Sequence, residues 1–158
     1  MTTIRPLNSD DLPRLRRFWR ERWGDEFVAL RGALVRPDGL DGFVAMEADD
    51  WIGLVTLMFG DGECEIISID SLREDRGIGG DLLERAARAA RERGCRRLFL
   101  ITTNDNLRAL AFYQKRGFEL AALHRGALNE SRKLKPSIPL IGDNGIPLRD
   151  EIELEMFL

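Results

Sequence analysis

The chain has 158 residues, 44% of them hydrophobic, and a formal net charge of −3. This length suits one well-buried core and is short for two, so we expect a single domain over residues 1–158. The arginines are scattered along helical patterns and form no concentrated basic face, which argues against nucleic-acid binding. No apolar run is long enough for a membrane span and no signal-peptide pattern begins the chain, so we expect a cytoplasmic protein without membrane contact.

The two cysteines, Cys64 and Cys95, lack both CxxC spacing and histidine partners. Residues in this setting are typical of ordinary reduced thiols in an intracellular protein. We therefore expect no disulfide and no metal site.

The first part of the chain predicts a short strand followed by an amphipathic helix. Residues 3–7 are extended in pattern, and Ser9 or Asp10 is placed to cap a helix that ends at Gly24. Residues 25–42 are interrupted by glycine and proline, which predicts a short helix or strand plus a loop. Apolar residues at helical spacing indicate a helix that packs against a core: Leu12, Leu15, Phe18, Trp19 and Trp23.

The middle of the chain predicts an antiparallel meander that leads into a glycine-rich turn. Residues 43–48, 51–59 and 63–70 are apolar runs separated by turn residues. The turn Gly77-Ile78-Gly79-Gly80 then opens an alanine-rich helix that ends at Gly94. A strand, a glycine loop and a helix in this order form an anion site, because glycine admits close approach and the first helical N–H groups are free.

The rest of the chain predicts a strand parallel to an earlier one, a second helix and two final strands. Residues 98–103 follow a strand–helix path, so they should run parallel to residues 63–70. A helix over residues 105–116, capped by Asn104 or Asp105, should be followed by strands over 118–123 and 151–158. The Pro/Gly-rich residues 125–150 are long for a connection between them, which indicates a functional or mobile segment.

Two motifs about thirty residues apart carry a family resemblance. The first, Glu74-Asp75-Arg76-Gly77-Ile78-Gly79, matches Gln/Arg-x-x-Gly-x-Gly/Ala except at Glu74. The second, from Asn106 to Phe118, matches Asn-x-x-Ala-x-x-(aromatic or Leu)-Tyr-x-x-x-Gly-Phe. With the element order ββββαβαββ, they resemble the GNAT superfamily of acetyl-CoA-dependent N-acetyltransferases over nearly the whole chain. The resemblance implies an α/β fold: a central, mostly antiparallel sheet with a splayed parallel strand pair and flanking helices.

The resemblance also implies an activity and a binding site. The domain would transfer the acetyl group of acetyl-CoA directly to a primary amine, without a metal, and residues 125–150 would form an insertion on the acceptor side. Tyr113 would protonate the departing thiolate, and Glu74 would point away from the pyrophosphate, since two negative charges repel. The cosubstrate would contact Ile67, Ser68, Ile69, Asp75, Arg76, Gly77, Ile78, Gly79, Gly80, Asn106 and Tyr113.

The general base is left open between two glutamates on the strand before the loop. Glu63 matches the position used by histone-type relatives, and Glu65 lies on the same strand face. Relatives that carry the base on the following strand offer no model, because Ile101 stands there. His124, the only histidine, is a weaker candidate.

The same residues bear on two alternative functions and on the expected partners. A dinucleotide-binding loop fits poorly, because Leu82 stands where a third glycine is needed. A non-catalytic acyl-CoA-binding or sensor module on the same fold stays open as the alternative. The expected partners are acetyl-CoA and an amine-bearing acceptor of unidentified class, and a homodimer is left open. Asp25, Glu26, Asp38 and Asp41 favour a cationic acceptor.

Overall fold

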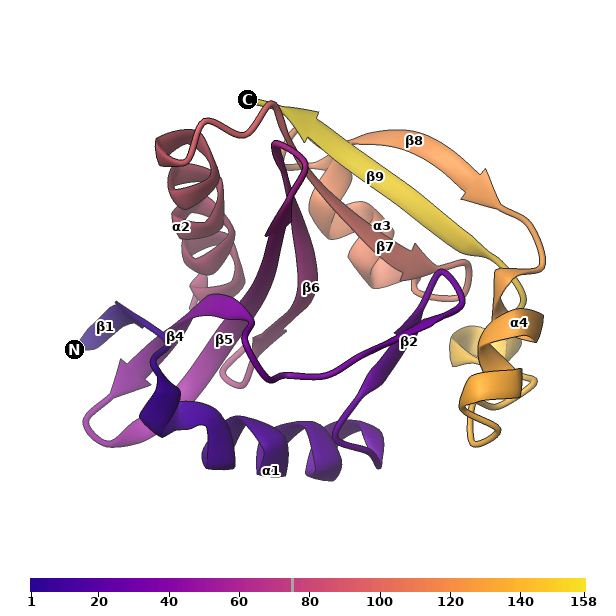
Figure 1. Cartoon of the computed structure of the whole chain (residues 1–158), viewed down its shortest axis with the longest axis horizontal. Coiled ribbons are helices and arrows are strands. Elements are labelled where there is room, and N and C mark those ends of the chain that lie inside the picture. The colour runs from indigo at the N-terminus through magenta and orange to yellow at the C-terminus, as the bar shows by residue number, and fades with distance from the viewer. Residues whose placement is uncertain (75) are drawn as a thin grey trace.

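The computed structural model describes residues 1–74 and 76–158, and these form a seven-stranded sheet with the order β1-β4-β5-β6-β7-β9-β8 (Figure 1). Its β6–β7 pair is parallel and its other neighbours are antiparallel, as the sequence predicted. The strands are β1 Thr2–Pro6, β4 Asp41–Glu47, β5 Asp50–Gly60, β6 Glu63–Ser71, β7 Arg97–Thr103, β8 Glu119–His124 and β9 Glu151–Phe157.

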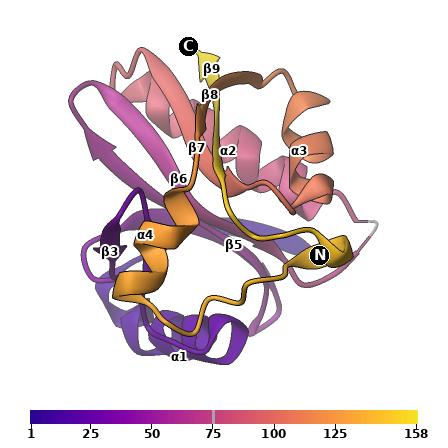
Figure 2. The ribbon, with the colours of Figure 1, turned by 90° about the vertical axis from the view of Figure 1, so that its right-hand side faces the viewer.

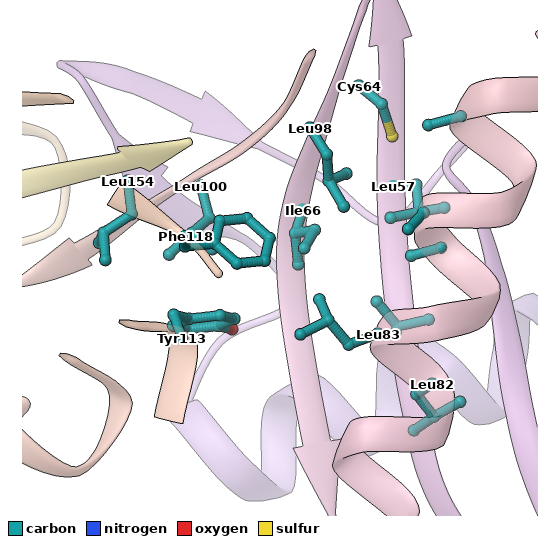
Figure 3. Close-up of a cluster of buried hydrophobic side chains, with 14 of the residues drawn as sticks. Leu57, Cys64, Ile66, Leu82, Leu83, Leu98, Leu100, Tyr113, Phe118 and Leu154 are labelled. Atoms are coloured by element: carbon teal, nitrogen blue, oxygen red, sulfur yellow. The ribbon is translucent and has the colours of Figure 1, made fainter. Parts of the chain in front are cut away.

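Helices cover both faces of the sheet. The helix α1 (Leu12–Trp23) packs on one face through Leu15 and Trp19, whereas α2 (Ile78–Glu92) and α3 (Leu107–Gln114) pack on the other. Figure 2 shows α3 and α4 on opposite sides of β7 and β9. The core beneath α2 and α3 joins aliphatic side chains of the sheet to Tyr113 and Phe118 (Figure 3).

The helix boundaries differ from expectation at two N-termini. Before α1 lies the 3-10 turn Ser9–Asp11, and its cap is Asn8, whose side chain accepts from the Asp10 N–H; Ser9 and Asp10 were wrong as caps. At α3 the cap is Asn106, so the helix begins at Leu107 and the predicted caps Asn104 and Asp105 were wrong. Gly24 ends α1 in the left-handed region (φ 80°), as predicted.

The sheet opens between β6 and β7. Their parallel register runs from Glu63–Arg97 to Ile66–Leu100 and stops there, although both strands continue. On the other side of β6 the register to β5 shifts by one residue, which leaves Ile67 as a β-bulge. A bulge bends its strand and increases the local twist, so β6 turns away from β7 at Ile67.

Two connections lie on the α1 face of the sheet. Residues 25–42 contain a separate hairpin, β2 (Val28–Leu30) and β3 (Ala33–Val35). Residues 125–150 contain a helix that the sequence reading missed, α4 (Ala127–Leu134), and the 3-10 turn Asp143–Gly145. The two connections meet, because the Lys135 ammonium donates to the Phe27 carbonyl at 3.3 Å.

Residues 125–150 are folded back on themselves by hydrogen bonds from one side chain and from the backbone. The Arg132 guanidinium donates to the carbonyls of Ile138, Pro139 and Leu148. The Gly142 N–H donates to the Ile146 carbonyl and the Leu148 N–H to the Leu140 carbonyl. These bonds satisfy backbone groups outside any regular ladder, which explains how an irregular sequence holds one shape. None of the helices in the described part of the chain has the length and apolar character to cross a membrane.

Candidate active site

A cleft of about 780 Å³ opens where β6 and β7 separate. It extends from the glycine-rich turn to the end of α1 and the turn at Asp143. Nine of the residues predicted to bind the cosubstrate line it: Ile67, Ser68, Ile69, Gly77, Ile78, Gly79, Gly80, Asn106 and Tyr113. Asp75, also predicted, lies outside the described residues.

The glycine-rich turn places the start of α2 at the cleft. Gly77 caps the helix at φ 69°, a left-handed conformation that glycine adopts without strain. The N–H groups of the first turn have no carbonyl of their own helix to pair with, and the helix dipole adds positive potential there. A Cβ on Gly79 would lie 3.3 Å from the Phe112 ring, so this glycine also lets α3 pack closely.

Four arginines line the cleft: Arg22 at the end of α1 and three beside the glycine-rich turn, of which the sequence analysis missed two. Arg108 and Arg116 lie on α3 and just beyond it, and Arg73 lies in the turn before α2. Arg116 stacks on the Phe112 ring with its Cζ 3.8 Å from the ring centroid, close to Gly80. The spacing could have indicated that Arg108 and Arg116 lie together, because residues 108, 112 and 116 recur about one turn apart on a helix face.

Two charged residues of the first motif, Glu74 and Arg76, lie in the described part of the chain. Glu74 borders the cleft with a side chain that is 75% exposed, and its carboxylate lies 3.5 Å from the Arg108 guanidinium. The expectation that Glu74 points away from a bound pyrophosphate stays a prediction. The Arg76 guanidinium pairs with Glu47 and is not among the cleft-lining groups, so cosubstrate binding by Arg76 stays a prediction.

The two side chains of the second motif both reach the cleft. Asn106 uses its carbonyl oxygen to accept the Ala109 N–H at 3.1 Å, which leaves its amide N–H groups for other partners. Tyr113 is buried in edge-on contact with Phe118, and its hydroxyl end points toward the strand that carries Ile66 (Figure 3). Burial raises the pKa of the Tyr113 hydroxyl above its usual range, with the negative charge of Asp70 as a second cause, so the hydroxyl keeps its proton.

The two candidate bases have opposite environments. Glu63 is held by the guanidinium groups of Arg96 and Arg97, and the hydrogen bond from Arg97 is the main cause of its lowered pKa. Glu65 is only 3% exposed, and burial raises its pKa despite an ion pair with Arg31. Glu65 also pairs with Phe99 one step before the parallel register ends. Neither glutamate is among the cleft-lining residues, so a role of either one as the base stays a prediction.

The structure also places three other residues that the sequence analysis considered for the reaction. The His124 Nε2 lies 3.1 Å from the Glu153 carboxylate oxygen that accepts its hydrogen bond, so one ring nitrogen is already engaged. Ile101 lines the cleft with an apolar side chain. Cys64 is buried in the core, and burial raises the pKa of its thiol to about 12, which keeps it from acting as a nucleophile.

A buried carboxylate in the cleft was not anticipated. Asp70 is 8% exposed and accepts from the Arg22 guanidinium at 3.1 Å, while its Oδ2 has no hydrogen-bond partner among the described residues. Burial raises its pKa. The regular alternation of strand side chains did not predict its position. The bulge at Ile67 shifts the strand register by one residue, so the side chains beyond it face the opposite side of the sheet from that expected.

Comparison with known proteins agrees with this geometry. The sequence model of the acetyltransferase (GNAT) family matches residues 5–118. The chain belongs to the GNAT family of acetyltransferases. It is 48% identical over 138 residues to the Bacillus subtilis (strain 168) protein YxbD, covering 87% of each chain. It is 44% identical over 153 residues to the B. subtilis (strain 168) protein YdhI, covering 96% of each chain.

A solved GNAT structure extends the match to the fold. The crystal structure of a GNAT family acetyltransferase from Elizabethkingia anophelis with acetyl-CoA bound is 25% identical, with a TM-score of 0.72. The match covers 99% of this chain and 98% of that chain. The sequence-based expectations of a GNAT fold and an acetyltransferase are therefore confirmed.

The residues of the cleft fit an acyl-CoA. The free N–H groups at the start of α2, with Arg73, Arg108 and Arg116 around them, suit phosphate groups. The narrow gap between β6 and β7 exposes strand backbone, which suits the amide-containing pantetheine arm. Acetyl-CoA, when bound, supplies the activated acetyl group.

A variant of Arg116 tests the phosphate end of the cleft. Arg116→Gln should weaken CoA binding roughly tenfold, because a charge-assisted hydrogen bond to an anion is worth about 1.5–3 kcal/mol. Isothermal titration calorimetry measures this change directly. Arg88→Gln removes the same charge from an exposed position on α2 and should bind CoA like the wild type. Equal affinity of the two variants would contradict the assignment of Arg116.

Proposed function

We propose that this chain transfers the acetyl group of acetyl-CoA directly to a primary amine. The observation that carries the proposal is the position of Tyr113, whose buried, protonated hydroxyl faces the opening between β6 and β7. In the transfer, the amine nitrogen forms a bond to the acetyl carbon and the carbon–sulfur bond breaks. A base takes a proton from the nitrogen, and Tyr113 gives a proton to the sulfur.

The strand backbone at the bulge has a role in the proposed reaction. Ile67 is the unpaired residue of the bulge, and Ser68 and Ile69 follow it along the cleft. N–H groups that face a reacting carbonyl stabilise the negative charge that develops on its oxygen. We assign this role to the backbone of residues 67–69, together with hydrogen bonds to the pantetheine arm.

We assign the base to Glu65 in preference to Glu63. A base that works near neutral pH needs a pKa raised toward that range. Burial provides this at Glu65, whereas the cations of Arg96 and Arg97 lower the pKa of Glu63. Proton transfer from the amine to Glu65 then proceeds directly or through one water molecule.

The buried cysteine supports direct transfer. A covalent relay needs a thiolate beside the thioester, and the Cys64 thiol is buried in the core with a pKa of about 12. The alternative of a non-catalytic acyl-CoA-binding module predicts CoA binding with no thiol release from acetyl-CoA over any amine. The same assay of thiol release therefore distinguishes the two functions.

Removing the Tyr113 hydroxyl tests the proposed acid. Tyr113→Phe should lower kcat by about 10² or more, since general acid–base catalysis contributes that much. CoA affinity should change little, because the ring and its packing against Phe118 remain. Steady-state kinetics and calorimetry measure the two quantities separately. Wild-type turnover in Tyr113→Phe would refute the acid role.

The pH dependence of kcat/KM tests the proposed base. Glu65 accepts a proton only when it is ionised, so kcat/KM should rise with pH through a midpoint above the usual glutamate pKa of about 4.3. Glu65→Gln should lower kcat by about 10² or more and remove this rising limb. Glu63→Gln should keep the limb. A lost limb in Glu63→Gln, with the limb retained in Glu65→Gln, would reverse the assignment.

A further inference from the structure

The tip of the β2–β3 hairpin lies across the sheet beside the opening between β6 and β7. Arg31 is the tip residue, and its main-chain N–H donates to Glu151 Oε1 at 3.1 Å. Its guanidinium reaches Glu65 Oε1 at 2.6 Å and lies over the Phe99 ring. Figure 1 shows the hairpin next to the end of β7. Arg31 thus contacts β9 through its main chain and β6 through its side chain, on either side of β7.

Three carboxylates lie near the Arg31 guanidinium, and Arg97, which pairs with Glu153, is a second cation beside them. Glu65 and Glu151 are 3% and 1% exposed, and Glu153 lies close enough to influence Glu65. Glu65 Oε2 is buried and has no hydrogen-bond partner among the described residues. A buried carboxylate oxygen without a partner is costly and favours a second cationic donor.

The acids that the sequence suggested for this role are already paired. Asp38 pairs with Arg16, Glu26 with Arg20, and Asp41 with Arg93. Asp25 lies 3.8 Å from the Lys135 ammonium. Near the hairpin, the buried carboxylate oxygen without a partner among the described residues is therefore Glu65 Oε2, and none lies on residues 25–41.

The contact that can open is the one at the hairpin tip. The strands of the hairpin form a sheet of their own, and Val28, Leu30 and Val35 pack against the core beneath α1, so the hairpin itself is held in place. Arg31 has φ 51°, a left-handed conformation that costs free energy for a non-glycine residue. Its side chain is 41% exposed, whereas that of Glu65 is 4% exposed, so the contact opens from the solvent side.

We propose that the Arg31 guanidinium occupies a cation-binding subsite of the acceptor site, and that the cationic acceptor displaces it from Glu65. This inference rests on the proposed function, because it places the acceptor next to the proposed base. The acceptor class follows from the charges: an amine with net positive charge is favoured. An amine that carries a neighbouring carboxylate is disfavoured, because Glu65 and Glu151 would repel it.

The first test uses methylguanidinium as a probe in NMR titrations of the full chain. Arg31→Gln should bind methylguanidinium roughly tenfold more tightly than the wild type, because a charge-assisted hydrogen bond becomes available. Guanidinoacetate has the same cation with an added carboxylate and should bind Arg31→Gln roughly tenfold more weakly than methylguanidinium. Adding Glu65→Gln to Arg31→Gln should remove the gain.

Two controls separate the subsite from general charge effects. Arg31→Lys keeps a cation at the tip and should bind the probe like the wild type. Arg36→Gln removes a charge from an exposed residue of the same connection and should also behave like the wild type. Equal probe affinity in Arg31→Gln and Arg36→Gln, or equal binding of the two probes, would overturn the proposal.

A second test uses the unmodified chain and does not depend on how a variant folds. Saturating methylguanidinium should speed hydrogen exchange at the N–H groups of the Arg31 guanidinium, because displacement breaks their bond to Glu65. Unchanged exchange at saturation would overturn the proposal. Neither test uses acetyl transfer. Failure of the proposed function shows as missing thiol release from acetyl-CoA, and failure of this inference shows as missing probe binding.

Discussion

The bulge at Ile67 is the constraint on which the rest of the structure depends. Seven strands in continuous register would leave no gap, but the extra residue in β6 ends its pairing with β7 after Ile66. The gap exposes strand backbone at the centre of the sheet, so the strand itself can form hydrogen bonds with a ligand. The helices then complete the cleft: α2 presents its N-terminus, and α3 presents Asn106 and Tyr113. A single local irregularity therefore creates both the binding cleft and the proposed reaction site.

The titratable groups around this gap are separated by their environments. Glu63 and Glu65 lie two residues apart on one strand, yet arginines lower the pKa of the first and burial raises that of the second. Tyr113 and Cys64 are both buried, which keeps the hydroxyl and the thiol protonated. The proposed acid and base roles thus rest on burial and neighbouring charge more than on residue type, as is general for sites that use both an acid and a base.

The sequence was sufficient for the fold because its signals are local and agree with one another. Turn residues, apolar runs and the glycine loop predicted the meander and the parallel pair, and the spacing of Asn106 and Tyr113 put both at one cleft. What it did not reveal depends on contacts between distant residues. Arg97 lies 34 positions from Glu63, and Arg31 lies 34 positions from Glu65, so their ion pairs leave no local pattern. The helix α4 was hidden by surrounding proline and glycine, and it is held by tertiary hydrogen bonds from Arg132. The bulge at Ile67 could not be predicted either, because no residue in this run of apolar side chains marks its position.

The most direct test of the central claim is the hydrogen exchange of individual backbone amides with and without CoA, measured by NMR. If the gap at Ile67 is the binding cleft, CoA should slow exchange at residues 67–69 and at residues 78–80 together, since both groups line it. Residues of β1 and β4, at the far edge of the sheet, should be unaffected. Protection confined to other surfaces, with residues 67–69 unchanged at saturating CoA, would contradict the account.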